Sequence, residues 1–114
     1  MKALQILLLI IFLILYRASA QVPSIQWQNC YGGSNVDAAF SCIQTADGGY
    51  FIGGTSRSND GDVTLHHGSD IYVDYWTLKV DAAGTIEWQK AYGGSNSDKL
   101  NHVIQTADGG YLLT

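Results

Sequence analysis

The strongest constraint on this chain is an internal repeat with a fixed spacing of 61 residues. Residues 25–35 (IQWQNCYGGSN) are echoed by residues 86–96 (IEWQKAYGGSN), and residues 43–50 (IQTADGGY) return unchanged as residues 104–111. From residues 25 and 86 onwards, 17 of 29 aligned positions are identical and no gap is needed. Self-similarity at a fixed period of this length is typical of architectures that stack one supersecondary unit on its copies.

One repeat contains four stretches with the composition of short β-strands, at residues 38–45, 50–55, 71–80 and 85–91. The first two are separated by Ala-Asp-Gly-Gly, which supplies the positive φ angles of a tight hairpin. In the third stretch apolar and polar side chains alternate, which is the period-2 pattern of a half-buried strand. The sequence therefore predicts an all-β fold of antiparallel four-stranded units.

Four strands in a unit too small to bury its own apolar side are typical of repeated β architectures. We expect β-propeller blades, with a β-solenoid or a β-prism as the alternative. Propellers close with about 4–8 blades, so we expect an incomplete ring and an N-terminal fragment of a longer protein. The predicted parts are a signal peptide at 1–20, the final strand of a preceding blade at 21–35, one complete four-stranded repeat at 36–96 and a truncated repeat at 97–114.

The first 20 residues have the pattern of a secretory signal peptide, which we expect to be helical. Lys2 gives a positive start, residues 6–16 form an uninterrupted apolar run, and residues 18–20 (ASA) match the small-x-small cleavage pattern. A membrane-spanning helix needs about 20 apolar residues, so this run is too short for an anchor. We predict cleavage after Ala20, membrane contact only before cleavage, and a secreted or bacterial cell-surface location.

Removal of the leader leaves an acidic chain. Four basic residues remain against ten acidic ones, which gives a net charge of −6. A surface of this sign repels phosphate backbones, and the four cations form no basic stripe along the sequence. The composition therefore argues against nucleic acid as a partner.

Three motifs carry a resemblance to a known group of proteins. They are W-Q-x-x-Y-G-G-S-x-x-D at 27–37 and 88–98, Q-T-x-D-G-G-Y at 44–50 and 105–111, and D-x-x-G-x-I-x-W-Q-K at 81–90. Together they resemble the repeats of large secreted bacterial surface proteins of propeller-like type, many of which use type IX secretion. The resemblance implies export, a cell-surface or extracellular location, and further repeats of a full-length protein as the partners of this segment.

Residues 79–88 (KVDAAGTIEW) are also similar, more weakly, to the turn and tryptophan of the blades of quinoprotein dehydrogenases. In those enzymes the tryptophan locks neighbouring blades together. This resemblance implies a propeller architecture, and it makes a quinoprotein-type oxidoreductase one form of the enzymatic alternative.

Residues that recur with the repeat are interpreted as packing and turn elements. Trp27 and Trp88 occupy equivalent positions and Trp76 lies within a predicted strand. Aromatic side chains can stack on sugars, but a buried aromatic ring removes about 150–250 Å² from water, so we expect these three to pack in the core. The glycines and aspartates of the repeated turns are Gly32, Gly33, Gly93, Gly94, Asp47, Gly48, Gly49, Asp108, Gly109 and Gly110.

The longest loop of the repeat, from residue 56 to residue 69, is the candidate binding surface, because ligands are often bound by long loops on rigid scaffolds. Five candidate binding residues lie in this loop or directly after it: Asp60, Asp62, His66, His67 and Asp70. Three carboxylates suit Ca²⁺, but their spacing does not fit the D-x-[DN]-x-[DN]-G pattern. A solvated loop is therefore preferred, without a metal or another cofactor, and a calcium site is the alternative.

Two cysteines in an exported chain raise the question of a disulfide. Cys30 and Cys42 are replaced together in the second repeat, by Ala91 and Val103, as a bonded pair would be. In a propeller, however, the two would lie on outer and inner strands of different blades, too far apart for a bond. The bond is therefore left open, and its presence would favour a solenoid or a prism.

No spacing of a nucleophile and a base suggests a catalytic residue. Ser34 and Ser95 recur with the scaffold, which a catalytic residue has no reason to do. We therefore expect a non-catalytic scaffold that serves adhesion or binds an extracellular glycan, polymer or protein. The alternative is part of a propeller enzyme, either a quinoprotein-type oxidoreductase or a glycan-active hydrolase or lyase.

Overall fold

The computed structural model describes residue 5 and residues 22–114. Apart from Gln5, the predicted signal helix and its cleavage site lie outside these residues. Within the described part of the chain, no helix is long and apolar enough to span a membrane.

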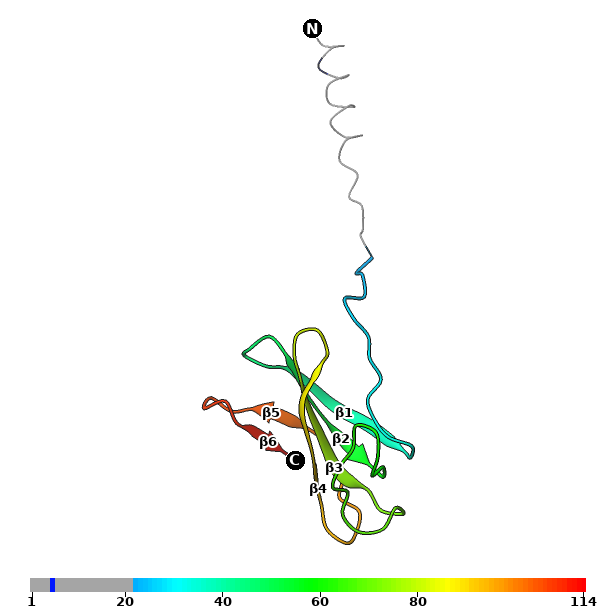
Figure 1. The fold of residues 1–114 in the computed structure, drawn as a ribbon. Helices are drawn as coiled ribbons and strands as arrows, with labels where there is room; N and C mark the ends of the chain where they lie inside the picture. Colours follow the sequence, from blue (N-terminus) through cyan, green and yellow to red (C-terminus); the bar gives the residue numbers. More distant parts are fainter. Residues whose placement is uncertain (1–4, 6–21) are drawn as a thin grey trace.

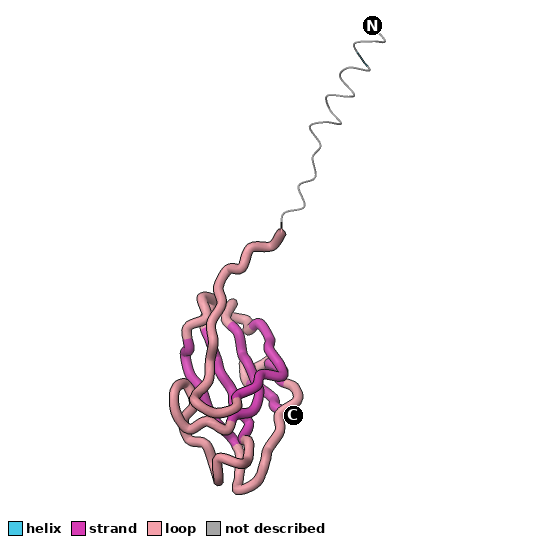
Figure 2. The backbone as a smooth tube through the Cα atoms, turned by 90° about the vertical axis from the view of Figure 1, so that its right-hand side faces the viewer, coloured by secondary structure: helices cyan, strands magenta, loops and turns pink. Residues whose placement is uncertain are grey.

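Residues 37–113 form two antiparallel β-sheets, as Figure 1 shows. The strands are β1 (Asp37–Gln44), β2 (Tyr50–Ser56), β3 (Asp74–Val80), β4 (Ile86–Tyr92), β5 (Val103–Gln105) and β6 (Tyr111–Leu113). The first four form one sheet in the order β1-β2-β3-β4, and β5 pairs with β6 in a separate hairpin. The predicted all-β fold and the four-stranded antiparallel unit are thus confirmed. The loops join the strands at both ends of the sheet (Figure 2).

Two predicted strands differ from the structure. The third begins at Asp74 rather than at residue 71, because residues 70–72 form a turn in which the Tyr72 N–H donates to the Ser69 carbonyl at 2.9 Å. Residues 25–31 form no strand in the described structure. The strand at this place in the repeat pairs with the third strand of its unit, as β4 pairs with β3. In this sheet β3 already has β2 and β4 as neighbours, so it offers no edge to residues 25–31.

The hairpin between β1 and β2 is held by a side chain of its own turn. The Thr45 N–H donates to the Gly49 carbonyl at 2.9 Å. The Asp47 carboxylate accepts from both the Thr45 hydroxyl and the Gly49 N–H, the latter at 3.0 Å. The hairpin between β5 and β6 forms the same hydrogen bonds with Thr106, Asp108 and Gly110.

The Gly-Gly-Ser-Asn turn that precedes each copy of the first strand also repeats its geometry. The Gly33 N–H donates to the Asp37 carboxylate at 2.8 Å. At the equivalent place in the second copy, the Gly94 N–H donates to the Asp98 carboxylate at 2.9 Å. In this turn the two copies therefore share the contact between the second glycine and the aspartate.

Apolar side chains are buried on both faces of the four-stranded sheet. On the first, which we call the hairpin face, Phe51 packs against Leu100 and Val103, together with partly buried side chains of the β5–β6 hairpin. On the second, which we call the segment face, Val63, Trp76 and Leu78 form the core, joined by the partly buried Tyr31, Ile52 and Ile86. The sheet thus has a separate core on each side.

The edge strand β1 is irregular. Its register against β2 shifts between Ala39 and Ser41, which leaves Phe40 as an extra residue, 60% exposed. Opposite the shift, a Cβ on Gly54 would lie 2.0 Å from the Ala38 carbonyl oxygen. The bulge therefore depends on a glycine in the neighbouring strand.

Gly53 sets the distance between the sheet and the hairpin on the hairpin face. A Cβ at this position would lie 2.5 Å from the Val103 side chain and 2.9 Å from that of Leu100. We expect Gly53→Ala to lower the free energy of unfolding by about 1–3 kcal/mol, because it overpacks this core. Urea unfolding followed by circular dichroism measures the change. Gly94→Ala is the matched control, since nothing lies within 4 Å of a Cβ there, and equal stability of the two variants would contradict the packing described.

Candidate functional site

The long loop after β2 and the Gly-Gly-Ser-Asn turn before β1 enclose a cavity of about 280 Å³, which we call the polar pocket. Its walls are made of hydrogen-bonding and charged groups of both signs. The lining residues are Ser34, Asn35, Arg57, Asn59, Asp60, His66, Gly68 and Asp70. The pocket thus joins a loop that follows β2 to a turn that precedes β1.

Three of the five predicted loop residues line this pocket and two do not. Asp60, His66 and Asp70 are at its wall. Asp62 instead accepts a hydrogen bond from the Gly32 N–H at 3.0 Å. The His67 ring Nδ1 lies 2.9 Å from the carboxylate of the buried Asp74. Asp62 therefore ties the loop to the turn before β1, and His67 ties it to the first residue of β3.

Asp60 has a second role as a link between the two walls. Its carboxylate accepts a hydrogen bond from the Ser34 N–H at 2.7 Å. This hydrogen bond, together with one from the Ser34 side chain, holds the pKa of Asp60 below its ordinary value. Beside it, the Ser58 hydroxyl accepts from the Asn35 N–H at 3.0 Å and donates to Asp37 at 2.9 Å. The pocket wall is thus anchored to the first residue of β1.

The ring of His66 is oriented by a backbone carbonyl. Its Nε2 lies 3.1 Å from the Tyr72 carbonyl oxygen, which only accepts hydrogen bonds, so Nε2 carries the hydrogen. In the neutral ring Nδ1 is then an acceptor. His66 therefore presents a defined tautomer at the wall of the pocket.

The other five lining residues, Ser34, Asn35, Arg57, Asn59 and Gly68, were not predicted as site residues. Arg57 brings the one positive charge, and Ser34, Asn35 and Asn59 bring hydroxyl and amide groups. Arg57 could have been found, since it is the only arginine after residue 20 and belongs to the same polar loop. Ser34 and Asn35 could not, because they are part of a turn that recurs in both repeats and carries no sign of a pocket.

The loop does not bring its carboxylates together as a calcium site, which was the alternative interpretation. Among residue 5 and residues 22–114, no group of three or more His, Cys, Asp or Glu side chains is arranged to hold a metal ion. Asp60 and Asp62 each use a carboxylate oxygen to accept a backbone N–H of the neighbouring turn. The two carboxylates thus act as acceptors for the turn.

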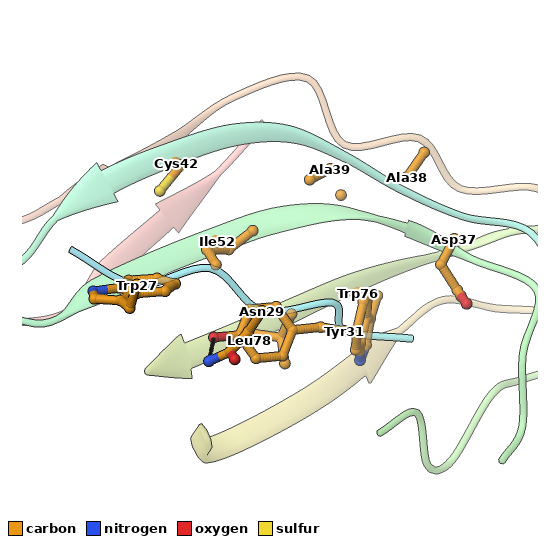
Figure 3. Close-up of a pocket in the computed structure, with 11 residues that line it drawn as sticks. Trp27, Asn29, Tyr31, Asp37, Ala38, Ala39, Cys42, Ile52, Trp76 and Leu78 are labelled. Carbon is orange, nitrogen blue, oxygen red and sulfur yellow. Dashed lines mark hydrogen bonds between the residues drawn. The ribbon is translucent and has the colours of Figure 1, made fainter. Parts of the chain in front are cut away.

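A second, mainly apolar cavity of about 390 Å³ lies between residues 27–31 and the segment face. Figure 3 shows the segment that carries Trp27, Asn29 and Tyr31 crossing in front of β2 and β3. The Asn29 amide and the Tyr31 hydroxyl both donate to the Gly84 carbonyl, which ties the segment to the β3–β4 turn. The apolar cavity is therefore a packing gap beside residues 27–31, which are held on the sheet by side-chain hydrogen bonds.

Cys42 lines the apolar cavity, and burial raises the pKa of its thiol. Cys30 and Cys42 are both free thiols in the structure. The structure thus shows no bond between these two cysteines.

Of the three tryptophans expected in the core, only Trp76 is buried, whereas Trp27 is partly exposed and Trp88 is 40% exposed. Trp76 is 5% exposed, and its indole N–H donates to the Gln89 side chain at 3.0 Å. Trp27 lies edge-on to Tyr50 with ring centroids 5.6 Å apart. Trp88 lies 6.1 Å from Tyr111. The last two pairs are the same contact displaced by 61 residues, since both members shift by that number.

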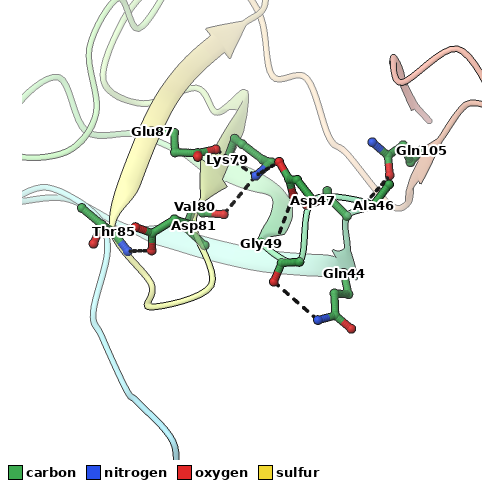
Figure 4. A network of polar contacts seen from close by, with 12 residues as sticks. Gln44, Ala46, Asp47, Gly49, Lys79, Val80, Asp81, Thr85, Glu87 and Gln105 are labelled. Carbon is green, nitrogen blue, oxygen red and sulfur yellow. Dashed lines mark hydrogen bonds and ion pairs between the residues drawn. The ribbon is translucent and has the colours of Figure 1, made fainter.

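Lys79 is the centre of a polar network on the hairpin face (Figure 4). Its ammonium group lies 2.9 Å from the Asp47 carboxylate and 2.8 Å from that of Glu87, and the residue is 4% exposed. Burial lowers the pKa of Lys79, but the hydrogen bonds and negative charges of Glu87 and Asp47 outweigh this effect and raise it. The network therefore joins the β1–β2 hairpin to β3 and β4.

One contact pairs a hydroxyl with an imidazole. Ser41 Oγ lies 3.4 Å from His102 Nδ1, and the same hydroxyl accepts from the Val103 N–H at 3.2 Å. The first distance is long for a hydrogen bond between a nucleophile and its base. In the described part of the chain, no carboxylate is hydrogen-bonded to His102 to orient it, so the contact lacks the features of a catalytic dyad.

The comparisons with known proteins leave the site to be interpreted from its geometry. Neither a scan against protein-family models nor a search of curated proteins finds a match to this chain.

The lowered pKa of Asp47 predicts how the stability of the fold depends on pH. Hydrogen bonds from Thr45, Lys79 and Gly49 hold the pKa of Asp47 well below its ordinary value. A carboxyl group whose pKa is lower in the folded than in the unfolded chain stabilises the fold above the unfolded pKa of about 4. This contribution is lost as the pH falls below that value.

We therefore expect urea unfolding midpoints to decrease between pH 7 and pH 3, and Asp47→Asn to reduce this decrease while lowering the midpoint at pH 7. Asp70→Asn removes the same charge from the pocket wall and is the control. If both variants showed the pH dependence of the unchanged chain, the role assigned to Asp47 would be wrong.

Proposed function

We propose that this chain is part of a secreted or cell-surface β-repeat scaffold that binds an extracellular polymer or protein through the polar pocket and performs no catalysis. The observation that carries the proposal is the construction of the pocket. The pocket is formed where a long polar loop, residues 56–70, is held against a turn that recurs in both copies of the repeat. Loops on a rigid scaffold are the usual place of binding residues.

The scaffold is proposed to be made of β-propeller blades. A meander in the order β1-β2-β3-β4, packed on both faces, is the arrangement expected of a blade between two others. The recurrence of the Trp27–Tyr50 contact as Trp88–Tyr111 supports residues 25–31 as the last strand of a preceding blade. The β5–β6 hairpin is then the start of the next, and further repeats are the partners of both.

Secretion is proposed from the leader and from the resemblance to type IX-associated surface repeats. We expect the exported protein to begin at Gln21, because residues 18–20 have the small-x-small pattern of a cleavage site. Edman sequencing of the exported chain measures this directly. Ala18→Arg should retain the uncleaved form, and retention of the leader on the unchanged exported chain would remove the basis for a soluble secreted form.

The lining of the polar pocket suits a ligand rich in hydroxyl groups. The Arg57 guanidinium and the amide groups of Asn35 and Asn59 can donate, and the Asp70 carboxylate and His66 Nδ1 can accept. Hydrogen bonds to charged groups contribute about 1.5–3 kcal/mol each, more than neutral ones. A polysaccharide presents donors and acceptors on every hydroxyl, so it is the polymer we favour.

The test is binding of the purified full-length chain to an array of immobilised neutral and acidic polysaccharides. We expect at least one to bind, and Arg57→Ala to weaken that binding by about tenfold or more, because a charge-assisted hydrogen bond is lost. Lys99→Ala, which removes an exposed cation outside the pocket, should leave binding unchanged.

Circular dichroism of each variant shows whether the sheet is intact. Binding that is insensitive to Arg57→Ala, or equally sensitive to both substitutions, would show that the polar pocket is not the site. Absence of binding to the whole array would remove polysaccharide as the ligand class.

A further inference from the structure

The polar pocket has charged groups of both signs on its walls. Arg57 and Asp70 line the same cavity, but neither takes part in an ion pair within residues 22–114. We propose that the pocket binds a sugar unit that carries a carboxylate, as a uronic acid does, and that Arg57 holds this carboxylate. The inference rests on the proposed function, because it names the class of polysaccharide that the same pocket takes.

The backbone on both sides of Arg57 is fixed. The hydroxyl groups of Ser56 and Ser58 both donate to the Asp37 carboxylate, and both serines are fully buried. The Arg57 N–H donates to the Val36 carbonyl at 3.0 Å. Because successive side chains of an extended chain point to opposite sides, Arg57 points away from the two serines, and it lines the pocket with an exposed side chain.

The chemistry of the Arg57 side chain selects the group that it can hold. A guanidinium presents five N–H donors in a planar fork, and this fork matches the two oxygens of a carboxylate. Two parallel charge-assisted hydrogen bonds then form, which fix the orientation of the anion as well as its position. A carboxylate on the sugar is therefore the group that uses this side chain fully.

The other charges of the pocket favour an anion with a single charge. Arg57 is the only Lys or Arg among the lining residues, whereas Asp60 and Asp70 are both acidic. The Ser34 N–H donates to Asp60 at 2.7 Å, and the lowered pKa of this aspartate keeps it ionised. A phosphate monoester brings a charge of about −1.5 to −2, which one guanidinium cannot neutralise beside two carboxylates. A carboxylate brings only one negative charge.

The remaining lining groups suit the hydroxyl groups of the same sugar unit. The Asp70 carboxylate can accept hydrogen bonds, and the amide groups of Asn35 and Asn59 can donate and accept them. His66 Nδ1 is an acceptor, because Nε2 donates to a backbone carbonyl. The cavity of about 280 Å³ is close to the lower limit of the range of about 300–1,000 Å³ for small-ligand pockets, so it takes one unit of a polymer.

The pocket is held in shape by contacts between its loop and its turn. Asp62 of the loop accepts from the Gly32 N–H of the turn at 3.0 Å. A Cβ on Gly61 would lie 2.5 Å from the Gly32 carbonyl oxygen, so the two segments are in direct contact. A preformed site loses little conformational freedom on binding. Differences in affinity between ligands should therefore report their contacts with the lining side chains.

The experiment uses oligomers of galacturonic, glucuronic and mannuronic acid, with the methyl ester of each as its uncharged match. Binding to the purified full-length chain is measured by isothermal titration calorimetry. We expect at least one acid to bind, and its ester to bind about tenfold or more weakly, because the charge-assisted hydrogen bonds to Arg57 are lost. Arg57→Gln should bind acid and ester equally. Arg57→Lys should keep part of the preference, since it keeps the charge without the fork.

Lys99→Gln is the matched control, because it removes an exposed cation outside the pocket and should keep the full preference for the acid. Circular dichroism of each variant shows whether the sheet is intact. Equal affinity for acid and ester, an unchanged preference in Arg57→Gln, or a lost preference in Lys99→Gln would each overturn the inference. Arg57-dependent binding of dextran sulfate in place of every uronic acid would also overturn it, because the anion would then be a sulfate ester.

Failure of the inference and failure of the proposed function give different results. If no uronic acid is preferred over its ester but a neutral polysaccharide binds and depends on Arg57, the proposed function stands and only the inference is wrong. If no polysaccharide of any kind binds, both are wrong.

Discussion

A β-sheet with apolar side chains on both faces must be covered on both, and this requirement governs the arrangement of the whole chain. Phe51 lies in the core of the hairpin face, and Trp76 and Leu78 lie in the core of the segment face. The four strands cannot cover themselves, so the β5–β6 hairpin and Leu100 cover the hairpin face, while residues 27–31 and Val63 lie on the segment face. The loop that carries Val63 into the core of the segment face also lines the polar pocket.

The period of the sequence predicted the fold because the repeated residues make contacts inside their own copy. Gly48 and Gly109 adopt φ angles of +86° and +88°, as the Asp-Gly-Gly turns require. Strand positions within residues 37–56 and 74–92 follow from the same local rules. The exception, residues 25–31, has a strand-like sequence but no ladder, since pairing depends on a partner strand that local sequence does not provide.

The candidate site was predicted only in part, for a related reason. The loop was recognisable from its length and polarity, and three of the five side chains predicted as site residues line the pocket. Which side chains point inward depends on hydrogen bonds to a distant turn, such as those of Asp60 to Ser34 and of Asp62 to Gly32. A spacing of two residues along the loop carries no information about these long-range contacts, so Asp60 and Asp62 could not be told apart by role.

The bulge in β1 has a consequence for how sheets of this kind meet. A kink at Phe40 interrupts the regular row of amide and carbonyl groups along that margin, which disfavours the docking of a straight strand there. The β5–β6 ladder runs in register without such an interruption. The two margins are therefore unequal: the one at β1 is blunted against a further strand, whereas the pairing of β5 with β6 is regular.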